Sequence, residues 1–218
     1  MRTIRVTGKG RVKCAPDLTR LTYTVQGTEP VYADALARSS RDSAALRDVL
    51  AELGFASDDL KTLSFDVDTR YEGYQDEKGE WRQRFVGYAF THLMKLEFPS
   101  DNALLGRLLY ALAHAPVETE FRLSYTVRDP EAAKTALLAA AVQDAAAKAH
   151  ALADAAGVKL GALQNIDYSR NEIDFEVRPV NRMLTSDAAP MAKGSYDMDL
   201  TPEDIETADT VTLVWEIA

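Results

Sequence analysis

A helix rich in alanine constrains the fold of this chain more than any other feature of its sequence. It occupies residues 129–157, where Asp129 is a favourable N-cap, Pro130 suits the first helical position and Gly157 can end the helix with a positive φ. Apolar residues recur along it at alternating steps of four and three, which predicts one buried face made of Leu138, Val142, Ala145, Ala149, Leu152 and Ala156. A face made mostly of alanine lets the helix backbone come close to the surface that it covers.

The composition limits the classes of protein to which the chain can belong. With 46% hydrophobic and 27% charged residues it is typical of a soluble globular protein. Its net charge of −9 repels phosphate backbones, so we expect no nucleic-acid partner. No apolar run approaches the roughly 20 residues that a membrane-spanning helix needs, so we expect no transmembrane segment.

The N-terminus and the cysteine content bear on localisation. The first ten residues lack the apolar core of a signal peptide, and Cys14 is the sole cysteine, so no intrachain disulfide can form. The sequence as written therefore predicts a cytoplasmic protein. A chain trimmed of an export signal would look the same, which leaves a periplasmic or extracytoplasmic location open.

The hydrophobic periodicity predicts an α+β fold, a mostly antiparallel sheet packed against three helices in the order ββα-ββα-β-α-β-β. The first helix is expected at residues 31–53, with Ala35, Ser39, Leu46, Val49, Leu50 and Leu53 on its buried side, and the second opens at residues 99–101.

Gly8 and Gly10 are interpreted as a bulge in the first strand. A strand through Leu63, Phe65 and Val67 is expected to be half-buried, residues 72–80 to form a hairpin loop, and residues 170–207 to form a long loop with room for a short edge strand.

Several collinear segments resemble the SIMPL-domain family, a group of bacterial proteins that includes periplasmic immunogenic and outer-membrane-associated members. The opening residues 6–17 match "V-x-G-x-G … P-D", and Gly87-Tyr88 matches "G-Y". Residues 141–161 match "A-V-x-D-A-x-x-K-A-x-x-L-A-x-x-x-G-x-x-L-G". The chain departs from the family at His114-Ala115, where a Gly-Ala pair is usual, and at Pro202-Glu203 in place of "P-G".

The resemblance implies one SIMPL-like domain over residues 1–218, built either as one body or as two interlocked subdomains. It also implies an α+β fold, and homo-oligomers that are ring-like or channel-like in some members. A link to stress tolerance is a further expectation. No common enzymatic activity is associated with the family, so no site residues transfer.

The residues themselves reveal no catalytic constellation. The segment around Gly8 and Gly10 lacks the P-loop pattern, and Cys14 has no evident basic partner. His92, His114 and His150 do not have metal-ligand spacing, and the carboxylates Asp66, Asp68, Glu72, Asp76 and Glu77 lack the calcium-loop pattern. We therefore predict no catalytic residue, no cofactor and no metal.

Tyr74 and Trp81 lie in or beside the polar hairpin loop, where exposed aromatic side chains often anchor interfaces. The leading hypothesis is a non-enzymatic protein that acts by homo-oligomeric assembly or by binding a protein partner. The alternative is a small-molecule binding protein or enzyme with a pocket between sheet and helices, in which His92 acts with Asp or Tyr neighbours.

Overall fold

The computed structural model describes residues 2–117, 119–168, 173, 175–178, 195–196 and 200–218. It confirms the α+β class and the predicted order of elements, with one very short strand added. The chain forms two compact units: unit 1 contains residues 1–17, 125–177 and 202–218, and unit 2 contains residues 18–124 and 178–201. The elements are β1 (Thr3–Cys14), β2 (Leu18–Glu29), α1 (Tyr32–Glu52), η1 (Ser57–Asp59), β3 (Lys61–Gln75), β4 (Trp81–Pro99), α2 (Asn102–Ala113), β5 (Glu120–Thr126), α3 (Pro130–Ala156), β6 (Leu160–Asp167), β7 (Glu176–Val177) and β8 (Ile205–Ile217).

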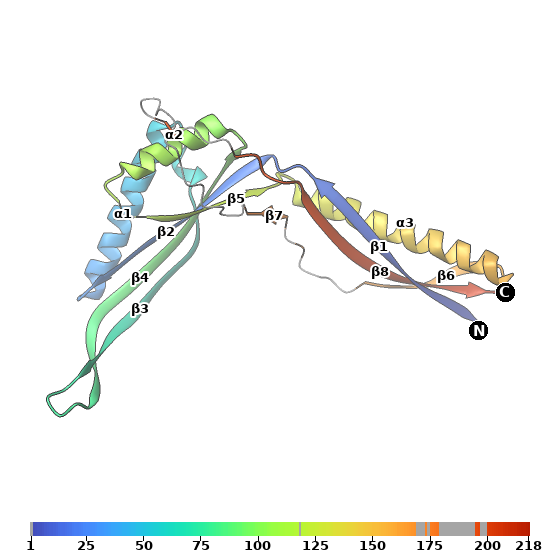
Figure 1. Ribbon diagram of the computed structural model, residues 1–218, viewed down its shortest axis with the longest axis horizontal. Helices are drawn as coiled ribbons and strands as arrows, with labels where there is room; N and C mark the ends of the chain where they lie inside the picture. The colour runs from blue at the N-terminus through green and yellow to red at the C-terminus, as the bar shows by residue number, and fades with distance from the viewer. Residues whose placement is uncertain (1, 118, 169–172, 174, 179–194, 197–199) are drawn as a thin grey trace. The chain divides into compact units, whose positions relative to one another are not determined.

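Unit 1 is a three-stranded antiparallel sheet in the order β1-β8-β6, with α3 packed along one face (Figure 1). Strand β1 pairs with β8 from Thr3 to Cys14 with no shift of register. The predicted bulge at Gly8 and Gly10 is therefore wrong. The packing of α3 against β1 explains the two glycines instead.

Gly8 and Gly10 let the backbone of α3 lie almost directly on β1. A Cβ atom at Gly8 would lie 2.0 Å from the carbonyl oxygen of Ala141, and one at Gly10 would lie 2.1 Å from that of Leu137. No side chain fits into that space, because both obstacles are backbone atoms of a helix. The two glycines are thus required by close approach of the helix to the strand.

The buried residues of α3 recur at steps of four: Leu137, Ala141, Ala145, Ala149 and Ala153. The predicted face was right at Ala145 and Ala149 but wrong at Val142 and Leu152, which are 38% and 52% exposed. The larger side chains are displaced to the flanks because the helix contacts the sheet through its backbone. The predicted ends are confirmed, since the Asp129 side chain accepts the Ala132 N–H and Gly157 has a φ of +70°.

Two side chains of α3 also bind the free edge of β1. Asp144 Oδ2 accepts the backbone N–H of Lys9 at 2.7 Å, and Lys148 Nζ lies 2.7 Å from the same oxygen and 3.5 Å from the Thr7 carbonyl. An edge strand needs such cover, because its unpaired backbone groups otherwise pair with another chain. The motif residues Asp144 and Lys148 therefore occupy an edge that β8 leaves open.

Removal of the Asp144 carboxylate should loosen β1. We expect Asp144→Ala to increase hydrogen exchange at the Lys9 amide. Asp154→Ala, which removes an exposed acid on the same helix, is the control.

Lys148 and the Lys9 N–H hold the pKa of Asp144 below its usual range. A lowered folded-state pKa means that this stabilisation is present above the unfolded-state pKa and is lost as the pH falls through the folded one. An Asp144→Asn protein should lack that component of acid destabilisation, and equal acid sensitivity in both proteins would contradict the assignment.

Unit 2 is built on the strands β3-β4-β2-β5, with α1 and α2 covering one face (Figure 1). The predicted buried side of α1 is confirmed at Ala35, Ser39, Leu46 and Leu50, while Val49 and Leu53 are half-buried. Asp101 caps α2 by accepting the N–H groups of Ala103 and Leu104. The core contains, among others, Leu21, Tyr23, Val25, Leu46, Phe90, Met94, Leu96, Leu105 and Leu108.

The hairpin of β3 and β4 is longer than the sequence predicts. Its loop comprises residues 76–80 rather than 72–80, because Tyr74 pairs with Arg82 and Gln75 pairs with Trp81. The half-buried strand predicted through Leu63 and Phe65 is also wrong, since these side chains are 50% and 42% exposed. Strand β3 lies at the end of its sheet and only Val67 in it is half-buried.

The loop predicted at residues 170–207 falls largely outside the described residues. Within the described part, β7 is a short edge strand of the kind for which the predicted loop left room, and it pairs with Tyr125 and Thr126 of β5. Residues 205–207 belong to β8 instead of to a loop.

Candidate interface on the β3–β4 hairpin

The end of the hairpin has two chemically different faces. Cross-strand partners share a face of an antiparallel pair, so the pairing assigns each side chain to one of them. We call the aromatic face the one that carries Tyr71, Gly73, Gln75, Trp81, Gln83 and Phe85, and the charged face the one that carries Arg70, Glu72, Tyr74, Arg82 and Arg84. An ion pair of 3.0 Å joins Glu72 and Arg84 on the charged face.

A ladder of rings follows the aromatic face outward from the core. Ring centroids lie 5.4 Å apart between Tyr32 and Tyr88, 5.4 Å between Tyr88 and Phe85, and 5.7 Å between Phe85 and Tyr71, all edge to face. Trp81 lies further out, with ring atoms 3.8 Å from the position of a Cβ on Gly73. Edge-to-face contacts of this kind fix the rings relative to one another.

The outer rings of this face are open to solvent although they continue the face that α1 covers. Tyr71 is 55% exposed, Phe85 44% and Trp81 75%. Figure 1 shows why: the hairpin extends beyond the N-terminal end of α1, where Tyr32 lies. A contiguous exposed aromatic patch of this kind is typical of an interaction site.

The hairpin tip is held in one conformation by Asp76. Its carboxylate accepts the N–H groups of Lys78 and Glu80 and bonds to Arg82, and Gly79 has a φ of +77°. The bond to Arg82, followed by the backbone bonds, holds the pKa of Asp76 below its usual range. A hairpin fixed in this way loses little conformational entropy on binding.

The glycine of the Gly-Tyr motif positions the ladder. The register of β4 shifts by one residue near Gly87, which leaves Val86 as the extra residue, and a Cβ on Gly87 would lie 2.3 Å from the Glu29 carbonyl oxygen. The end of β2 can therefore approach β4 at this point. The shift also returns Phe85 to the same face as Tyr88.

The two predicted interface residues do not lie together. Trp81 belongs to the aromatic face, whereas Tyr74 is 43% exposed on the charged face, opposite Arg82. Sequence reasoning missed Tyr32, because only the folded chain brings the start of α1 to Tyr88. Period-two alternation identifies Tyr71, but the extra residue Val86 shifts the phase before Phe85.

His92 is held as a structural residue. Its Nδ1 lies 2.9 Å from Ser43 Oγ and its Nε2 lies 2.9 Å from Thr62 Oγ1, so both ring nitrogens have hydroxyl partners. Burial, and then the charge of Arg47, lower its pKa. An open hollow of about 450 Å³ in unit 2 is lined by other residues, among them Thr24, Gln26 and Glu120. This arrangement does not favour the enzyme alternative.

The other candidate residues are scattered. Within the described ranges, no three His, Cys, Asp or Glu side chains form a group that could hold a metal ion. His114 packs on Tyr110, and Cys14 is a half-buried free thiol at the end of β1. Asp66, Asp68 and Glu72 are distributed along β3, and Glu77 lies in the tip loop.

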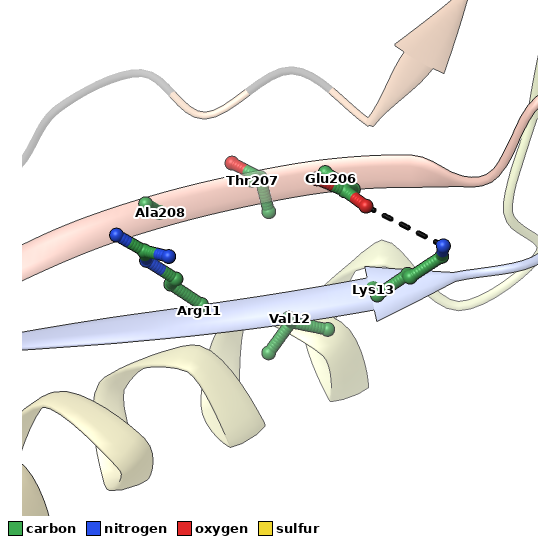
Figure 2. A pocket seen from close by; sticks show the side chains of 6 residues that line it. All are labelled: Arg11, Val12, Lys13, Glu206, Thr207 and Ala208. Atoms are coloured by element: carbon green, nitrogen blue, oxygen red, sulfur yellow. Dashed lines mark ion pairs between the residues drawn. The ribbon is translucent and has the colours of Figure 1, made fainter.

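Unit 1 has an open hollow of about 460 Å³ beside β1 and β8, lined by Arg11, Val12, Lys13, Glu206, Thr207 and Ala208. Figure 2 shows Lys13 and Glu206 pointing toward one another, and their ion pair measures 3.4 Å. Lys13 also pairs with Asp204 at 3.3 Å, and bonds to both carboxylates raise its pKa. A lysine kept charged in this way is unsuited to act as a nucleophile or base.

Comparison with known proteins agrees with the motif analysis. Residues 4–215 match the SIMPL family, described as a protein of unknown function (DUF541). Two relatives are the 26 kDa periplasmic immunogenic proteins of Brucella abortus (strain S19) and Brucella melitensis biotype 1 (strain ATCC 23456 / CCUG 17765 / NCTC 10094 / 16M). Each is 27% identical over 206 residues, which cover 90% of this chain and 82% of the relative.

The names of these relatives give no support to the cytoplasmic location expected from the N-terminus. No helix in the described part of the chain is long and apolar enough to cross a membrane. The match from residue 4 to residue 215 covers both units and every helix and strand that carries the glycine and alanine motifs. The chain belongs to the SIMPL family.

Proposed function

We propose that this chain acts without catalysis, by assembling with copies of itself through the aromatic face of the β3–β4 hairpin. The observation that carries the proposal is the exposure of Tyr71, Phe85 and Trp81 on a hairpin that is fixed at its tip, where Phe85 and Tyr71 continue a ladder of rings from Tyr32 and Tyr88. Aromatic side chains are enriched among the residues that supply most of the binding energy at interfaces. Another protein that offers an apolar surface is the second kind of partner that this face fits.

The distribution of charge favours a second copy as the partner. The chain carries a net charge of −9, so two copies repel one another over most of their surfaces. Residues 70–86 contain four basic residues, Arg70, Lys78, Arg82 and Arg84, and four acidic residues, Glu72, Asp76, Glu77 and Glu80, which gives this segment a net charge of zero. Association through the hairpin brings together the neutral part of each copy.

Truncation of the rings should weaken assembly. We expect Trp81→Ala and Phe85→Ala each to raise the dissociation constant by roughly 10- to 30-fold, the usual effect of removing an interface anchor. Size-exclusion chromatography with light scattering over a range of concentrations measures it. Phe121→Ala is a matched control, because Phe121 is a similarly exposed ring (47%) on β5.

A strict monomer at high concentration would contradict the proposal, as would equal effects of Trp81→Ala and Phe121→Ala. Tyr74→Ala tests the other predicted interface residue. A loss of assembly in that variant would mean that the contact includes the charged face as well.

We also propose an extracytoplasmic site of action and a contribution to stress tolerance. The first is supported by the names of the two relatives and the second by the family resemblance. Fractionation of cells that express the protein from its own gene tests the location. Recovery in the cytoplasm would contradict it.

A further inference from the structure

Strand β3 presents a long free edge. It is the terminal strand of its sheet, next to β4 alone, and 14 of its 15 residues are exposed, Val67 being the half-buried one. From Ser64 to Gln75 it runs without an extra residue, because Val86 of β4 is the residue that bulges near the middle of the hairpin. The outward backbone N–H and C=O groups of such an edge are a template for another strand.

The order of side chains along β3 is complementary to itself in one antiparallel register. With Thr69 opposite Thr69 of a second copy, Asp68 lies opposite Arg70 of that copy, and Arg70 opposite its Asp68. Neither Asp68 nor Arg70 forms an ion pair with another described residue of its own chain, whereas Glu72 is bound by Arg84. Both charges are therefore available for cross-strand pairing, which stabilises antiparallel strands.

The other face of β3 fits in the same register. Val67 lies opposite Tyr71 of the second copy, a β-branched and aromatic pair that is favourable across strands. Phe65 lies opposite Gly73, beside which Trp81 lies in its own chain. The Phe65 ring of one copy therefore lies opposite Gly73 of the other copy, which has no side chain. The two-fold symmetry of the pair repeats each such contact.

Neighbouring registers are less favourable. A shift that centres the pairing on Asp68 places the two Asp68 carboxylates opposite one another. A shift that centres it on Arg70 places the two arginines together and Asp68 opposite Glu72. Like charges directly opposite destabilise a strand pair, so the arrangement centred on Thr69 is preferred. Its unfavourable pair is Asp66 with Glu72, whose charge Arg84 offsets.

We propose that β3 pairs with β3 of a second copy, antiparallel and in the register centred on Thr69. The contact joins two sheets edge to edge and places the two aromatic faces on one continuous surface. This inference rests on the proposed function, and it adds the strand edge that would hold two copies side by side with their aromatic faces adjacent.

Charge reversal tests the pairing by sedimentation equilibrium. Asp68→Arg and Arg70→Asp should each weaken self-association about tenfold or more, because each converts two attractive pairs into two repulsive ones. An equimolar mixture of the two variants should associate as heterodimers, and the double variant should recover the affinity of the unmodified protein to within about threefold. Asp48→Arg and Arg41→Asp, reversals at exposed positions on α1, are the matched controls.

A cross-link tests the register. In a Cys14→Ser background, Thr69→Cys should form an intermolecular disulfide readily, because directly opposed residues on antiparallel strands have Cα atoms about 4.5–5.5 Å apart. Glu72→Cys is the control, since its counterpart in the second copy would lie six residues away along the strand, about 20 Å. Circular dichroism confirms that each variant is folded.

The outcomes separate the two proposals. A monomeric unmodified protein would overturn the proposed function and this inference with it. An oligomer that Trp81→Ala weakens, but that neither charge reversal nor Thr69→Cys affects, would overturn the β3 pairing alone. Recovery of affinity in the double variant, together with a specific cross-link in the Thr69→Cys protein, would support it.

Discussion

Unit 1 is expected to lose most of its stability when either glycine of β1 gains a side chain. Gly8→Val should reduce the free energy of unfolding by at least about 3 kcal/mol, because α3 must move away from the sheet to admit it. The obstacle is the Ala141 carbonyl oxygen, 2.0 Å from the new Cβ, and a helix backbone cannot rotate aside as a side chain can. Urea unfolding followed by circular dichroism measures the loss, and hydrogen exchange should increase in both β1 and α3.

Gly8→Ala should also destabilise unit 1, because its Cβ meets the same carbonyl oxygen, and Gly73→Ala is its matched control. Both glycines lie in strands, but a Cβ at Gly73 would have its nearest neighbours at 3.8 Å, an ordinary contact distance. We expect Gly73→Ala to be neutral or slightly stabilising, since alanine restricts the unfolded chain more than glycine does. Equal unfolding midpoints for Gly8→Ala and the unmodified protein would show that α3 does not lie this close to β1.

The second large effect is expected in the core of unit 2. Phe90 is 1% exposed, beneath α1, and Phe90→Ala should cost about 3–5 kcal/mol through lost burial and the cavity that remains. The loss should appear in the unfolding of unit 2, with tryptophan fluorescence from Trp81 as a local probe of the hairpin. Phe121→Ala, which truncates an exposed ring, should change the stability by less than about 1 kcal/mol.

Gly27 provides a test of the geometry around Phe90. A Cβ at Gly27 would lie 2.7 Å from Phe90 Cε1 and 3.0 Å from the guanidinium carbon of Arg38. Gly27→Ala alone should therefore destabilise unit 2. In the Phe90→Ala background the ring is gone, so the same change should cost much less. Additive effects in the double variant would rule out the contact.

Local signals in the sequence were sufficient for both ends of α3 and for the start of α2. Asp129, Asp101 and Gly157 act as the caps that their positions indicate, because capping depends on neighbours within one turn. The interpretation of Gly8 and Gly10 failed for the opposite reason. Their role is set by Leu137 and Ala141, more than 120 residues away, and no local rule distinguishes a bulge from a close approach.

The candidate site was partly visible in the sequence. Exposed aromatics near a hairpin were recognised at Trp81, but the predicted loop begins four residues too early in the chain, which concealed the paired arrangement of Tyr74 and Arg82. The alternation of Leu63, Phe65 and Val67 indicates a strand correctly and a buried face wrongly. Alternation records that one face is apolar. It does not indicate whether a helix or a second sheet of the same molecule covers that face.

The central place of β8 in the β1-β8-β6 sheet has a consequence for biosynthesis. A ribosome makes β1 first and β8 last of all the strands, so β1 and α3 must wait until nearly the whole chain has emerged before their sheet can close. Strands β2 to β5 are contiguous in the sequence and are complete much earlier. During that interval the nascent chain carries the unpaired Val6 face of β1 in the open. Chaperones that recognise extended apolar segments can bind β1 during this interval, before β8 pairs with it and completes the sheet of unit 1.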